Sequence, residues 1–333
     1  ARVGGASYQE LAARGGGILS TVRDTRRALM EQREELAGLL RGRLDQMLIH
    51  GTTTAEVKSG YGLSTETELA TLRLYQEVDH THPVDLIPTF LGAHEIPPEF
   101  RANGQTGRTR YLDLLCQETL PAVAEHGLAR FCDVFCEKGV FSVEESRRVL
   151  QRGIDLGLGA KIHCDQFNVL GGTALAAELG MVSVDHLHVT PRANVRDLAA
   201  GGAVAVGLPG VTYFLGIEDA TPWLEFHQAK VPVALATDFN PGTCMSSNLQ
   251  IIASIASSRW RMPDTLILRG LTIEAARAVG RADEIGSLAT GKLADLLILD
   301  CDHEGELTYH FGVNHVETVI KAGQVVVKGG RLA

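Results

Sequence analysis

Cysteine and aromatic residues are scarce in this sequence of 333 residues, which contains six cysteines and only 5% Phe, Trp and Tyr. The cysteines are scattered and form no Cys-x-x-Cys pair, a pattern that favours a reducing, cytosolic environment. No uninterrupted apolar run approaches the ~18 residues that a membrane-spanning helix needs. The first residues also lack the basic and then apolar pattern of a secretory signal. We therefore expect a cytoplasmic protein that does not insert into a membrane.

Positive charge is in deficit as well. The chain has 31 Lys and Arg against 40 Asp and Glu, which gives a net charge of −9. Nucleic acids and anionic membrane surfaces bind proteins through Lys and Arg, so we expect neither as a partner. Because 45% of the residues are hydrophobic, the chain has enough apolar side chains to bury a large core.

From residue 52 onward, short apolar or β-branched runs alternate with amphipathic stretches of helical length. This alternation is typical of repeated βα units around a parallel sheet. A doubly wound sheet could use seven strands, but the glycine-rich phosphate-binding motif that often follows its first strand is missing. A (β/α)8 barrel needs one strand more than the sequence offers. The seven predicted strands are 52–58, 84–91, 130–136, 159–163, 182–186, 203–207 and 231–237.

The two ends of the chain depart from this alternation. Residues 21–47 have apolar side chains at helical spacing with charges between them, which predicts one surface helix. Near the other end, residues 294–300 and 316–330 predict short strands with a turn at Ala322-Gly323. Two or three strands are marginal alone, so they need a partner. We therefore predict a βα domain over residues 1–282 and a small β appendage over residues 283–333.

Polar side chains lie where several of the predicted strands end. His94, His163, His186 and Asp238 each lie at or just after the C-terminal end of such a strand. In a parallel barrel these ends meet at one rim, where catalytic residues gather. A single buried histidine is more often a satisfied core residue than a ligand, so it is the shared position that favours a functional site.

His163 and Asp238 are the strongest candidates for metal ligands. Nitrogen and carboxylate ligands around an open coordination position suit a hydrolytic metal, which lowers the pKa of a bound water. Asp238 could also accept the proton of that water. Its alternative role is to cap a helix that begins near Ser246. Of the neighbouring pair His186 and His188, we assign only His186 to the site, because it lies closer to the end of its strand.

Cys164 directly follows His163 and raises the possibility of a nucleophile. Side chains alternate between the two faces of a strand, so Cys164 is expected to point toward the helices when His163 points into the site. A buried structural thiol is the favoured interpretation.

Five segments of the chain match the motifs of one family when they are taken together. They are EVKSGYGL (56–63), TFLGAHEIPPEF (89–100), KIHCDQFNVLGG (161–172), VDHLHVT (184–190) and ATDFNPGT (236–243). Together they resemble the imidazolonepropionases, cyclic-amide hydrolases of the amidohydrolase superfamily. The resemblance implies a (β/α)8 barrel of the α/β class with a small β-sandwich, one zinc or iron ion, a homodimer and a place in cytoplasmic histidine degradation. The implied reaction is hydrolysis of a small molecule, 4-imidazolone-5-propanoate, to N-formimino-L-glutamate.

The resemblance also implies roles for individual residues. His163 and Asp238 are expected to bind the metal, and Asp238, assisted by His186, is expected to carry the protons. Position 166 is Glu or Gln in this family, and the Gln found here can form hydrogen bonds but cannot act as a base. The positions expected to contact substrate or product are Tyr61, His94, Gln166, Asn240, Gly242 and Thr243.

The family pattern begins earlier than this sequence does. The first barrel strand of the family ends in a His-x-His pair that supplies two metal ligands, and an arginine that binds the substrate carboxylate follows. Residues 4–18 resemble the segment after that strand, and the sequence opens on Ala1 without Met. We therefore expect a barrel whose first strand lies outside the sequence.

Two other functions stay open from the sequence. One is a different cyclic amidohydrolase, or an aminohydrolase acting on a ring amidine, which a panel of ring substrates would distinguish. The other is a metal-poor barrel that binds a ligand without catalysis, because His163 and Asp238 are the only metal ligands that the sequence places. Metal content would distinguish this alternative.

Overall fold

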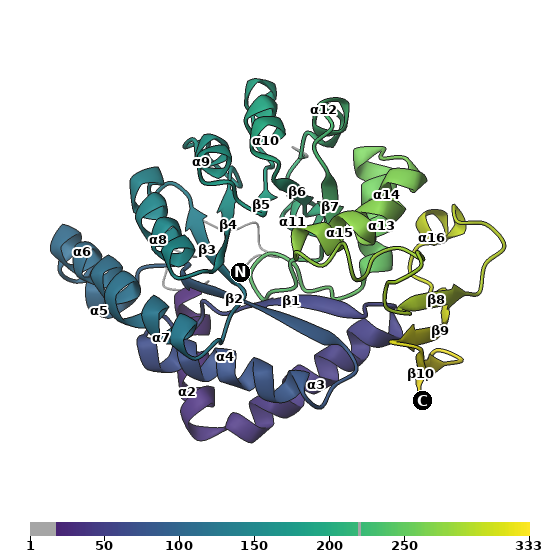
Figure 1. Cartoon of the computed structure of the whole chain (residues 1–333), viewed down its shortest axis with the longest axis horizontal. Helices are drawn as coiled ribbons and strands as arrows, with labels where there is room; N and C mark the ends of the chain where they lie inside the picture. Colours follow the sequence, from purple (N-terminus) through teal and green to yellow (C-terminus); the bar gives the residue numbers. More distant parts are fainter. Residues whose placement is uncertain (1–17, 219–220) are drawn as a thin grey trace.

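The computed structural model describes residues 18–218 and 221–333. Within these residues seven parallel strands form one sheet in the order β1 to β7, each paired with the next along the chain. The order has no reversal, which excludes the doubly wound alternative. Figure 1 shows the strands curled together with helices on their outer side, the arrangement of a (β/α) barrel. All seven predicted strands are confirmed, as β1 Thr54–Lys58, β2 Asp85–Ala93, β3 Phe131–Cys136, β4 Gly159–Cys164, β5 Ser183–His186, β6 Val204–Gly207 and β7 Val233–Leu235.

Helices precede β1, connect the strands and follow β7. Among them, α8 packs against β3 and β4, α9 against β4, and α15 against β6 and β7. None of the helices in the described part of the chain has the length and apolar composition needed to cross a bilayer. The helices are α2 Ile18–Glu31, α3 Arg33–Ile49, α4 Thr65–Asp79, α5 Pro98–Arg101, α6 Gly104–Leu114, α7 Leu120–Glu125, α8 Val143–Asp155, α9 Gly172–Leu179, α10 Val195–Gly201, α11 Pro209–Leu215, α12 Trp223–Gln228, α13 Leu249–Trp260, α14 Asp264–Leu271, α15 Ile273–Ala278 and α16 Glu306–Tyr309.

The single helix predicted over residues 21–47 is wrong, because the structure has two helices there, α2 and α3. They separate at Gln32, where the backbone leaves helical geometry at φ −137° and ψ 36°. Both helices contact α4, and α3 also contacts β9 (Val316–Lys321), a strand of the small C-terminal sheet. The chain therefore changes direction so that α3 can cover a second surface, a tertiary effect that helical periodicity does not encode. The segment 4–18, apart from Ile18, lies outside the described residues.

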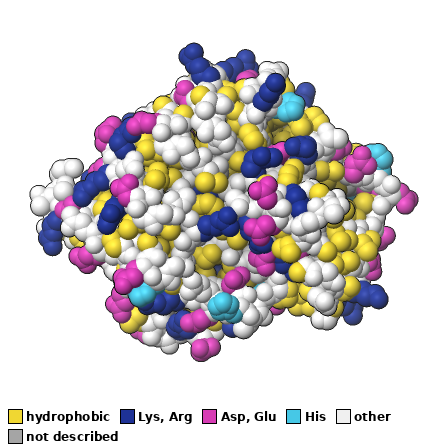
Figure 2. Space-filling model, viewed as in Figure 1, with side chains coloured by type: hydrophobic (Ala, Val, Ile, Leu, Met, Phe, Trp, Pro, Cys, Tyr) yellow, Lys and Arg dark blue, Asp and Glu magenta, His cyan; other side chains and the backbone are white. Residues whose placement is uncertain are grey.

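The last strands form a separate antiparallel sheet in the order β11-β10-β9-β8. Ala322 and Gly323 join β9 to β10 with φ values of 48° and 82°, as a two-residue type I′ turn requires. The predicted strands and their turn are confirmed. Figure 2 shows apolar side chains at the surface in the region of this sheet. Leu297, Ile298 and Val325 of the sheet are exposed. The bounds are β8 Leu296–Leu299, β9 Val316–Lys321, β10 Gln324–Lys328 and β11 Arg331–Leu332.

An apolar cluster and a group of ion pairs attach the small sheet to the barrel. The Asp85 Oδ2 atom, at the start of β2, lies 2.6 Å from Arg281 Nη1 and 2.8 Å from Lys321 Nζ. Lys321 also lies 2.6 Å from Asp295 Oδ2. Partial burial acts to raise the pKa of Asp85, but its hydrogen bonds to Lys321 and Arg281 lower it below the ordinary value. The buried apolar residues at this junction are Leu44, Leu48, Val78, Val84, Leu86, Val316, Val319 and Val327.

We predict that Asp85→Asn lowers the free energy of unfolding by about 1–2 kcal/mol at pH 7, because Arg281 and Lys321 lose a shared charged partner that is partly exposed. Since the pKa of Asp85 is lowered in the folded protein, this stabilisation is present above the unfolded-state pKa of about 4. It is lost as the pH falls through the lower, folded-state pKa. Chemical denaturation at a series of pH values measures it.

The matched control is Asp24→Asn, which removes a carboxylate whose ion pair with Arg23 is exposed. Such pairs contribute little, so the control should change the free energy of unfolding by less than about 0.5 kcal/mol. Equal losses in the two variants would contradict a specific role for Asp85.

Candidate functional site

The predicted site residues come together at the C-terminal rim of the parallel sheet. The ring centroid of His163 lies 5.2 Å from that of His186, and the His186 ring lies 5.1 Å from that of His188. On the neighbouring side of the rim, the rings of Tyr61 and His94 lie 5.2 Å apart in an edge-to-face arrangement. His163, His186 and His188 are buried.

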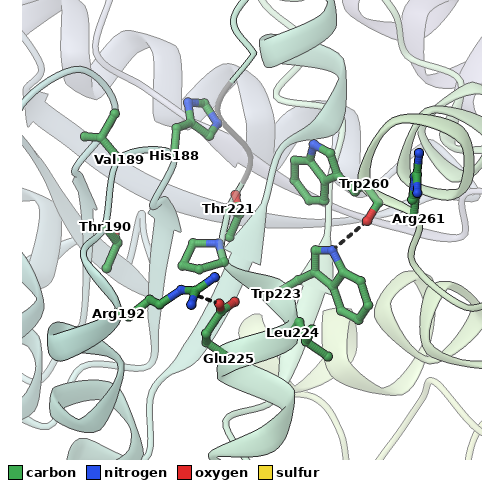
Figure 3. A pocket seen from close by; sticks show the side chains of 11 residues that line it. His188, Val189, Thr190, Arg192, Thr221, Trp223, Leu224, Glu225, Trp260 and Arg261 are labelled. Atoms are coloured by element: carbon green, nitrogen blue, oxygen red, sulfur yellow. Dashed lines mark hydrogen bonds and ion pairs between the residues drawn. The ribbon is translucent and has the colours of Figure 1, made fainter.

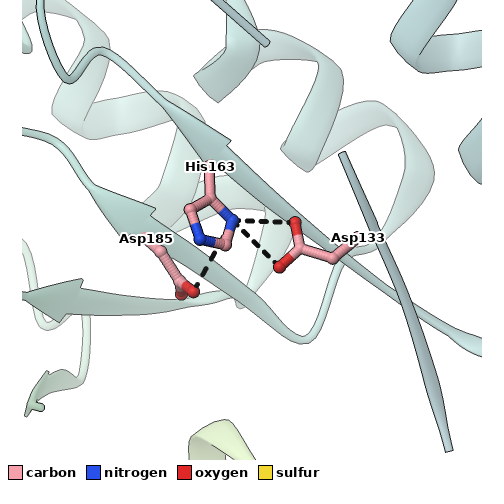
Figure 4. A group of neighbouring side chains, drawn as sticks. All are labelled: Asp133, His163 and Asp185. Atoms are coloured by element: carbon pink, nitrogen blue, oxygen red, sulfur yellow. Dashed lines mark hydrogen bonds and ion pairs between the residues drawn. The ribbon is translucent and has the colours of Figure 1, made fainter. Parts of the chain in front are cut away.

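His163 lies between two buried aspartates, Asp133 on β3 and Asp185 on β5 (Figure 4). Its Nδ1 atom lies 3.0 Å from Asp133 Oδ1, 2.9 Å from Asp133 Oδ2 and 4.0 Å from Asp185 Oδ2. A ligand atom from each of the three residues lies within 4.8 Å of the others, so the group is compact enough to hold one metal ion. With Nδ1–H donated to Asp133, the Nε2 atom of His163 is the one available to a metal.

A partly buried lysine, Lys58, lies among the same carboxylates, with 22% of its side chain exposed. The Lys58 Nζ atom on β1 lies 2.8 Å from Asp133 Oδ2, 3.2 Å from Asp185 Oδ2 and 2.9 Å from Glu56 Oε1. Burial acts to lower the pKa of Lys58, but the three carboxylates raise it well above the ordinary value. Burial likewise acts to raise the pKa of Asp133, and the charges of His163 and Lys58 lower it instead. Lys58 is therefore an ammonium and Asp133 a carboxylate at neutral pH.

A second pair of charged residues, Glu56 and Lys161, lies two residues closer to the start of their strands than Lys58 and His163 do. Lys161 Nζ on β4 is fully buried and lies 3.0 Å from Glu56 Oε2. Thr89 on β2 donates its hydroxyl to Glu56 Oε1 at 2.5 Å. Glu56 and Lys58, like Lys161 and His163, are two residues apart on one strand, so each pair points to the same side of the sheet. Charged side chains from β1, β3, β4 and β5, together with the Thr89 hydroxyl from β2, thus form one polar network.

The loop after β1, which carries Tyr61, is held by one buried carboxylate. Glu68, in the first turn of α4, accepts backbone N–H groups from Gly60 at 3.0 Å and from Gly62 and Leu63 at 2.8 Å. Gly60 has φ 103°, and a Cβ atom there would lie 2.6 Å from the backbone oxygen of Leu91, so glycine is required.

The same loop positions His94. The carbonyl of Gly60 lies 2.9 Å from His94 Nδ1, which donates to it. Burial lowers the pKa of His94 to about 4, so the ring is neutral at pH 7. Its Nε2 atom is then an acceptor.

Asp238 is held by a chain of hydrogen bonds through its loop. The Asn240 side chain donates to Thr243 Oγ1 at 2.8 Å, and Thr243 Oγ1 donates to Asp238 Oδ2 at 3.3 Å. Burial raises the pKa of Asp238 to about 6. The alternative role of Asp238 as a helix cap is wrong, because α13 begins at Leu249 and its cap is Asn248, which accepts from the Gln250 N–H.

Strained backbone accompanies these residues. Asp165, His186, Leu187 and Asp238 have φ values of 52°, 79°, 58° and 47°, in the left-handed region that non-glycine residues rarely adopt. All four lie just at or after the ends of β4, β5 and β7. Such conformations persist only where the surroundings hold them, and they gather at functional sites.

Gln166 is buried in the loop after β4. Glu137, after β3, accepts the N–H of Phe167 at 2.9 Å and that of Asn168 at 3.2 Å, which holds this loop in place. Asp165 accepts the Thr190 hydroxyl at 2.9 Å. The Gln166 side chain is therefore presented by a loop that is fixed from both sides.

Cys164 points away from the site, as predicted. A Cβ atom built on Gly172 of α9 would lie 2.7 Å from Cys164 Sγ, so the thiol packs against that helix. Burial raises the pKa of Cys164 well above the ordinary value. It is a structural thiol and not a nucleophile.

A pocket of about 740 Å³ is lined in part by His188, whose ring lies 5.1 Å from that of His186. Figure 3 shows Trp223 and Trp260 on one side of it, where the indole N–H of Trp223 donates to the carbonyl of Trp260 at 2.9 Å. Arg192 and Glu225 form an ion pair at 2.7 Å on the other side. The metal-ligating group found among the described residues, Asp133, His163 and Asp185, is not part of the lining of this pocket.

Sequence patterns alone single out neither Asp133, Lys58 nor Glu68. Asp133 nevertheless leaves a signal in the sequence, because a charged residue within a strand as apolar as 130–136 needs a buried partner. Lys58 is that partner in the structure. The partner itself comes from a distant strand, so the pairing requires the fold. Glu68 resembles an ordinary acidic residue of a first helical turn, and nothing in the sequence distinguishes it from Glu66.

Comparison with known proteins places this geometry in a family. Residues 12–327 match the amidohydrolase family. The chain is 44% identical over 331 residues to an imidazolonepropionase from Alkaliphilus metalliredigens, spanning 99% of this chain and 77% of the relative. It is 47% identical over 332 residues to an imidazolonepropionase from Symbiobacterium thermophilum, spanning 99% of this chain and 76% of the relative.

Solved structures share the fold at low identity. An adenosine deaminase from Xanthomonas campestris with bound zinc matches 92% of this chain and 73% of its own, with a TM-score of 0.67 and 19% identity. An N-isopropylammelide isopropylaminohydrolase from Burkholderia multivorans matches 94% of this chain and 80% of its own, with a TM-score of 0.70 and 17% identity. These likenesses support the barrel fold.

We predict that Glu68→Gln loosens the loop that carries Tyr61, because an amide has one acceptor oxygen where the carboxylate has two. Hydrogen exchange of the Gly60, Gly62 and Leu63 amides should accelerate by about 10-fold or more. Glu66→Gln, an exposed change in the same helical turn, is the control and should leave those rates unchanged. Equal exchange in the two variants would show that Glu68 does not hold the loop.

Proposed function

The chain belongs to the amidohydrolase family and, within it, to the imidazolonepropionases, and from this membership we propose that it hydrolyses 4-imidazolone-5-propanoate to N-formimino-L-glutamate. The observation that carries the proposal is the identity of 44% and 47% to imidazolonepropionases over 99% of the chain. The rim residues supply what the reaction needs, which is a metal-binding group, a proton carrier and polar side chains around a ring.

His163 and Asp238 are the proposed holders of one zinc or iron ion. When bound, such an ion lowers the pKa of a water molecule and polarises the carbonyl that the water attacks. An imidazole nitrogen and a carboxylate oxygen suit either metal. Two observations support the site: the hydrogen bond from His163 Nδ1 to Asp133, which leaves Nε2 available, and the zinc in a solved structure of the same fold.

Asp238 is the proposed proton carrier. It accepts a proton from water as the new C–O bond forms, and it delivers a proton to the ring nitrogen as the C–N bond breaks. Its burial supports this role, because a pKa of about 6 leaves the carboxylate ionised at pH 7 and basic enough to accept a proton. Burial lowers the pKa of His186 well below the ordinary value, so His186 is a neutral ring that can assist by hydrogen bonding.

The remaining residues are proposed to position the substrate. The His94 Nε2 atom can accept an N–H of the imidazolone ring, and the Gln166 amide can donate to it or accept from it. Tyr61, stacked edge-on against His94, would bind the propionate side. Gly242 and Thr243 lie on the loop that also carries Asp238.

Asn240 differs from these residues, because all the hydrogen-bonding positions of its side chain are occupied within that loop. It donates to the Asp238 carbonyl and to Thr243 Oγ1, and it accepts the N–H groups of Gly242 and Thr243, both at 2.8 Å. These four bonds saturate an amide side chain. We propose that Asn240 acts on the substrate by shaping the loop.

We further propose that the chain works on this small molecule as a homodimer in the cytoplasm. The six cysteines are all free, which supports a reducing compartment. Residues 1–282 are the proposed barrel domain, and residues 283–333 the C-terminal part of a small β-sandwich. The separate antiparallel sheet of β8 to β11 supports this division.

We predict that Asp238→Asn lowers kcat by about 1,000-fold, because an amide cannot carry the proton. Loss of imidazolone absorbance measures the rate. The control is Asp113→Asn, which removes a half-exposed carboxylate paired with Arg148 and should leave kcat unchanged. A metal-loaded wild-type chain that turns over guanine, cytosine or dihydroorotate but not the imidazolone would overturn the proposed substrate.

Metal content tests the ligand assignment independently of turnover. We predict that the purified chain binds zinc or iron and that His163→Ala abolishes binding. Asp133→Asn should weaken metal affinity by about 10–100-fold, because it removes the group that orients His163 without removing a ligand. Elemental analysis and competition with a chelator measure both. A folded wild-type chain that binds neither metal would favour the non-catalytic alternative.

A further inference from the structure

A cation of the protein itself, the ammonium of Lys58, lies against the group formed by Asp133, His163 and Asp185. The three shortest contacts of Lys58 Nζ are 2.8 Å to Asp133, 2.9 Å to Glu56 and 3.2 Å to Asp185. The ammonium donates hydrogen bonds to Glu56 and Asp133, and Asp185 is its third ion-pair partner. Its side chain is 22% exposed, and that of Asp133 is fully buried. Three carboxylates therefore surround the Lys58 ammonium, as they would surround a bound metal ion.

The position of this ammonium coincides with a group of metal-ligand atoms. Asp133, His163 and Asp185 offer two carboxylate oxygens and an imidazole nitrogen within 4.8 Å of one another. Lys58 touches both of the carboxylates in that group, so a divalent ion and the ammonium would compete for the same oxygens. The lysine enters from β1, whereas the three ligand groups come from β3, β4 and β5.

The local charge balance explains why a cation is needed there. As a metal ligand through Nε2, His163 is a neutral ring. Glu56, Asp133 and Asp185 then contribute three negative charges, and Lys58 and Lys161 contribute two positive charges, which leaves one negative charge beside His163. Removing Lys58 would leave two uncompensated charges in a buried place, which is costly unless another cation enters. Lys161 contacts Glu56 and does not reach either aspartate of the metal-ligand group among the described ion pairs.

We propose that the Lys58 ammonium takes the place of a second cation beside Asp133 and Asp185, so that these carboxylates do not bind metal, and that removing Lys58 creates a new divalent-cation site between Asp133, Asp185 and the Nδ1 atom of His163. The additional ion would take Nδ1 in place of its proton, which would be released to solvent, and would leave Nε2 to the first ion. The inference rests on the proposed function only in that the wild-type site holds one metal ion. It does not depend on the substrate.

The test compares Lys58→Ala with wild type in the full chain. Dialysis against Zn²⁺ or Co²⁺ followed by elemental analysis should show about one additional equivalent in the variant, because two carboxylates and an imidazole suit these ions. Thermal denaturation should show a rise in Tm on adding Zn²⁺ that is larger in Lys58→Ala than in wild type, since the metal replaces the missing charge.

Two further variants make the test specific. Lys161→Ala removes the other buried ammonium of the same network and should gain no metal. Lys58→Ala combined with Asp133→Asn should lose the additional equivalent, because a ligand is gone. If Lys58→Ala folds only when refolded with Zn²⁺, the proposal is supported by that dependence.

Three results would overturn the proposal. They are equal metal content in wild type and Lys58→Ala, an equal gain in Lys161→Ala, and a Lys58→Ala variant that stays unfolded with and without Zn²⁺. Failure of the proposed function gives a different pattern. A wild-type chain that does not hydrolyse the imidazolone, together with a Lys58→Ala variant that gains a metal ion, would refute the substrate and leave the role of Lys58 intact.

Discussion

The buried contact between Lys58, Asp133 and His163 is the interaction on which the rest of the site depends. It joins β1, β3 and β4 through side chains that are fully buried in Asp133, 8% exposed in His163 and 22% exposed in Lys58, so each charge depends on its neighbours for compensation. Apolar side chains of similar size would stabilise such an interior as well or better. The charges therefore matter for orientation, because Asp133 fixes which nitrogen of His163 carries its proton and which one faces the rim.

The loops of the rim are also fixed by buried or partly buried polar contacts, here between side chains and backbone N–H groups. Glu68 holds the loop of Tyr61, Glu137 holds the loop of Gln166, and Asn240 holds the loop of Asp238. In each case one side chain accepts two or more backbone N–H groups of a loop that follows a strand. A loop with its own hydrogen-bonding partner can keep a left-handed residue such as Asp238 in place. The side chains proposed to meet the substrate are thus positioned by the protein itself.

The sequence predicts those features that depend on near neighbours. The seven strands follow from runs of apolar residues, and the hairpin after β9 follows from Gly323, because both signals lie within a few residues. Parallel strands then bring His163, His186 and Asp238 to one rim without further information. The pairing of Lys58 with Asp133 joins residues 75 positions apart across a curled sheet. The break at Gln32 allows α3 to contact the small sheet, which is formed by residues near the other end of the chain. Neither is visible in local periodicity.

Asp133 and Asp238 show how the surroundings of a carboxylate decide its chemistry. Burial acts to raise the pKa of both, but Asp133 also contacts Lys58 and His163, whose charges lower its pKa below the ordinary value. Asp238 has a hydroxyl as its hydrogen-bond partner, and burial raises its pKa to about 6. A carboxylate that binds protons so weakly makes a poor base and a good permanent partner for an imidazole, whereas one near pH 6 can accept a proton and release it. The charged partners His163 and Lys58 therefore distinguish Asp133, which orients the His163 ring, from Asp238, the proposed proton carrier.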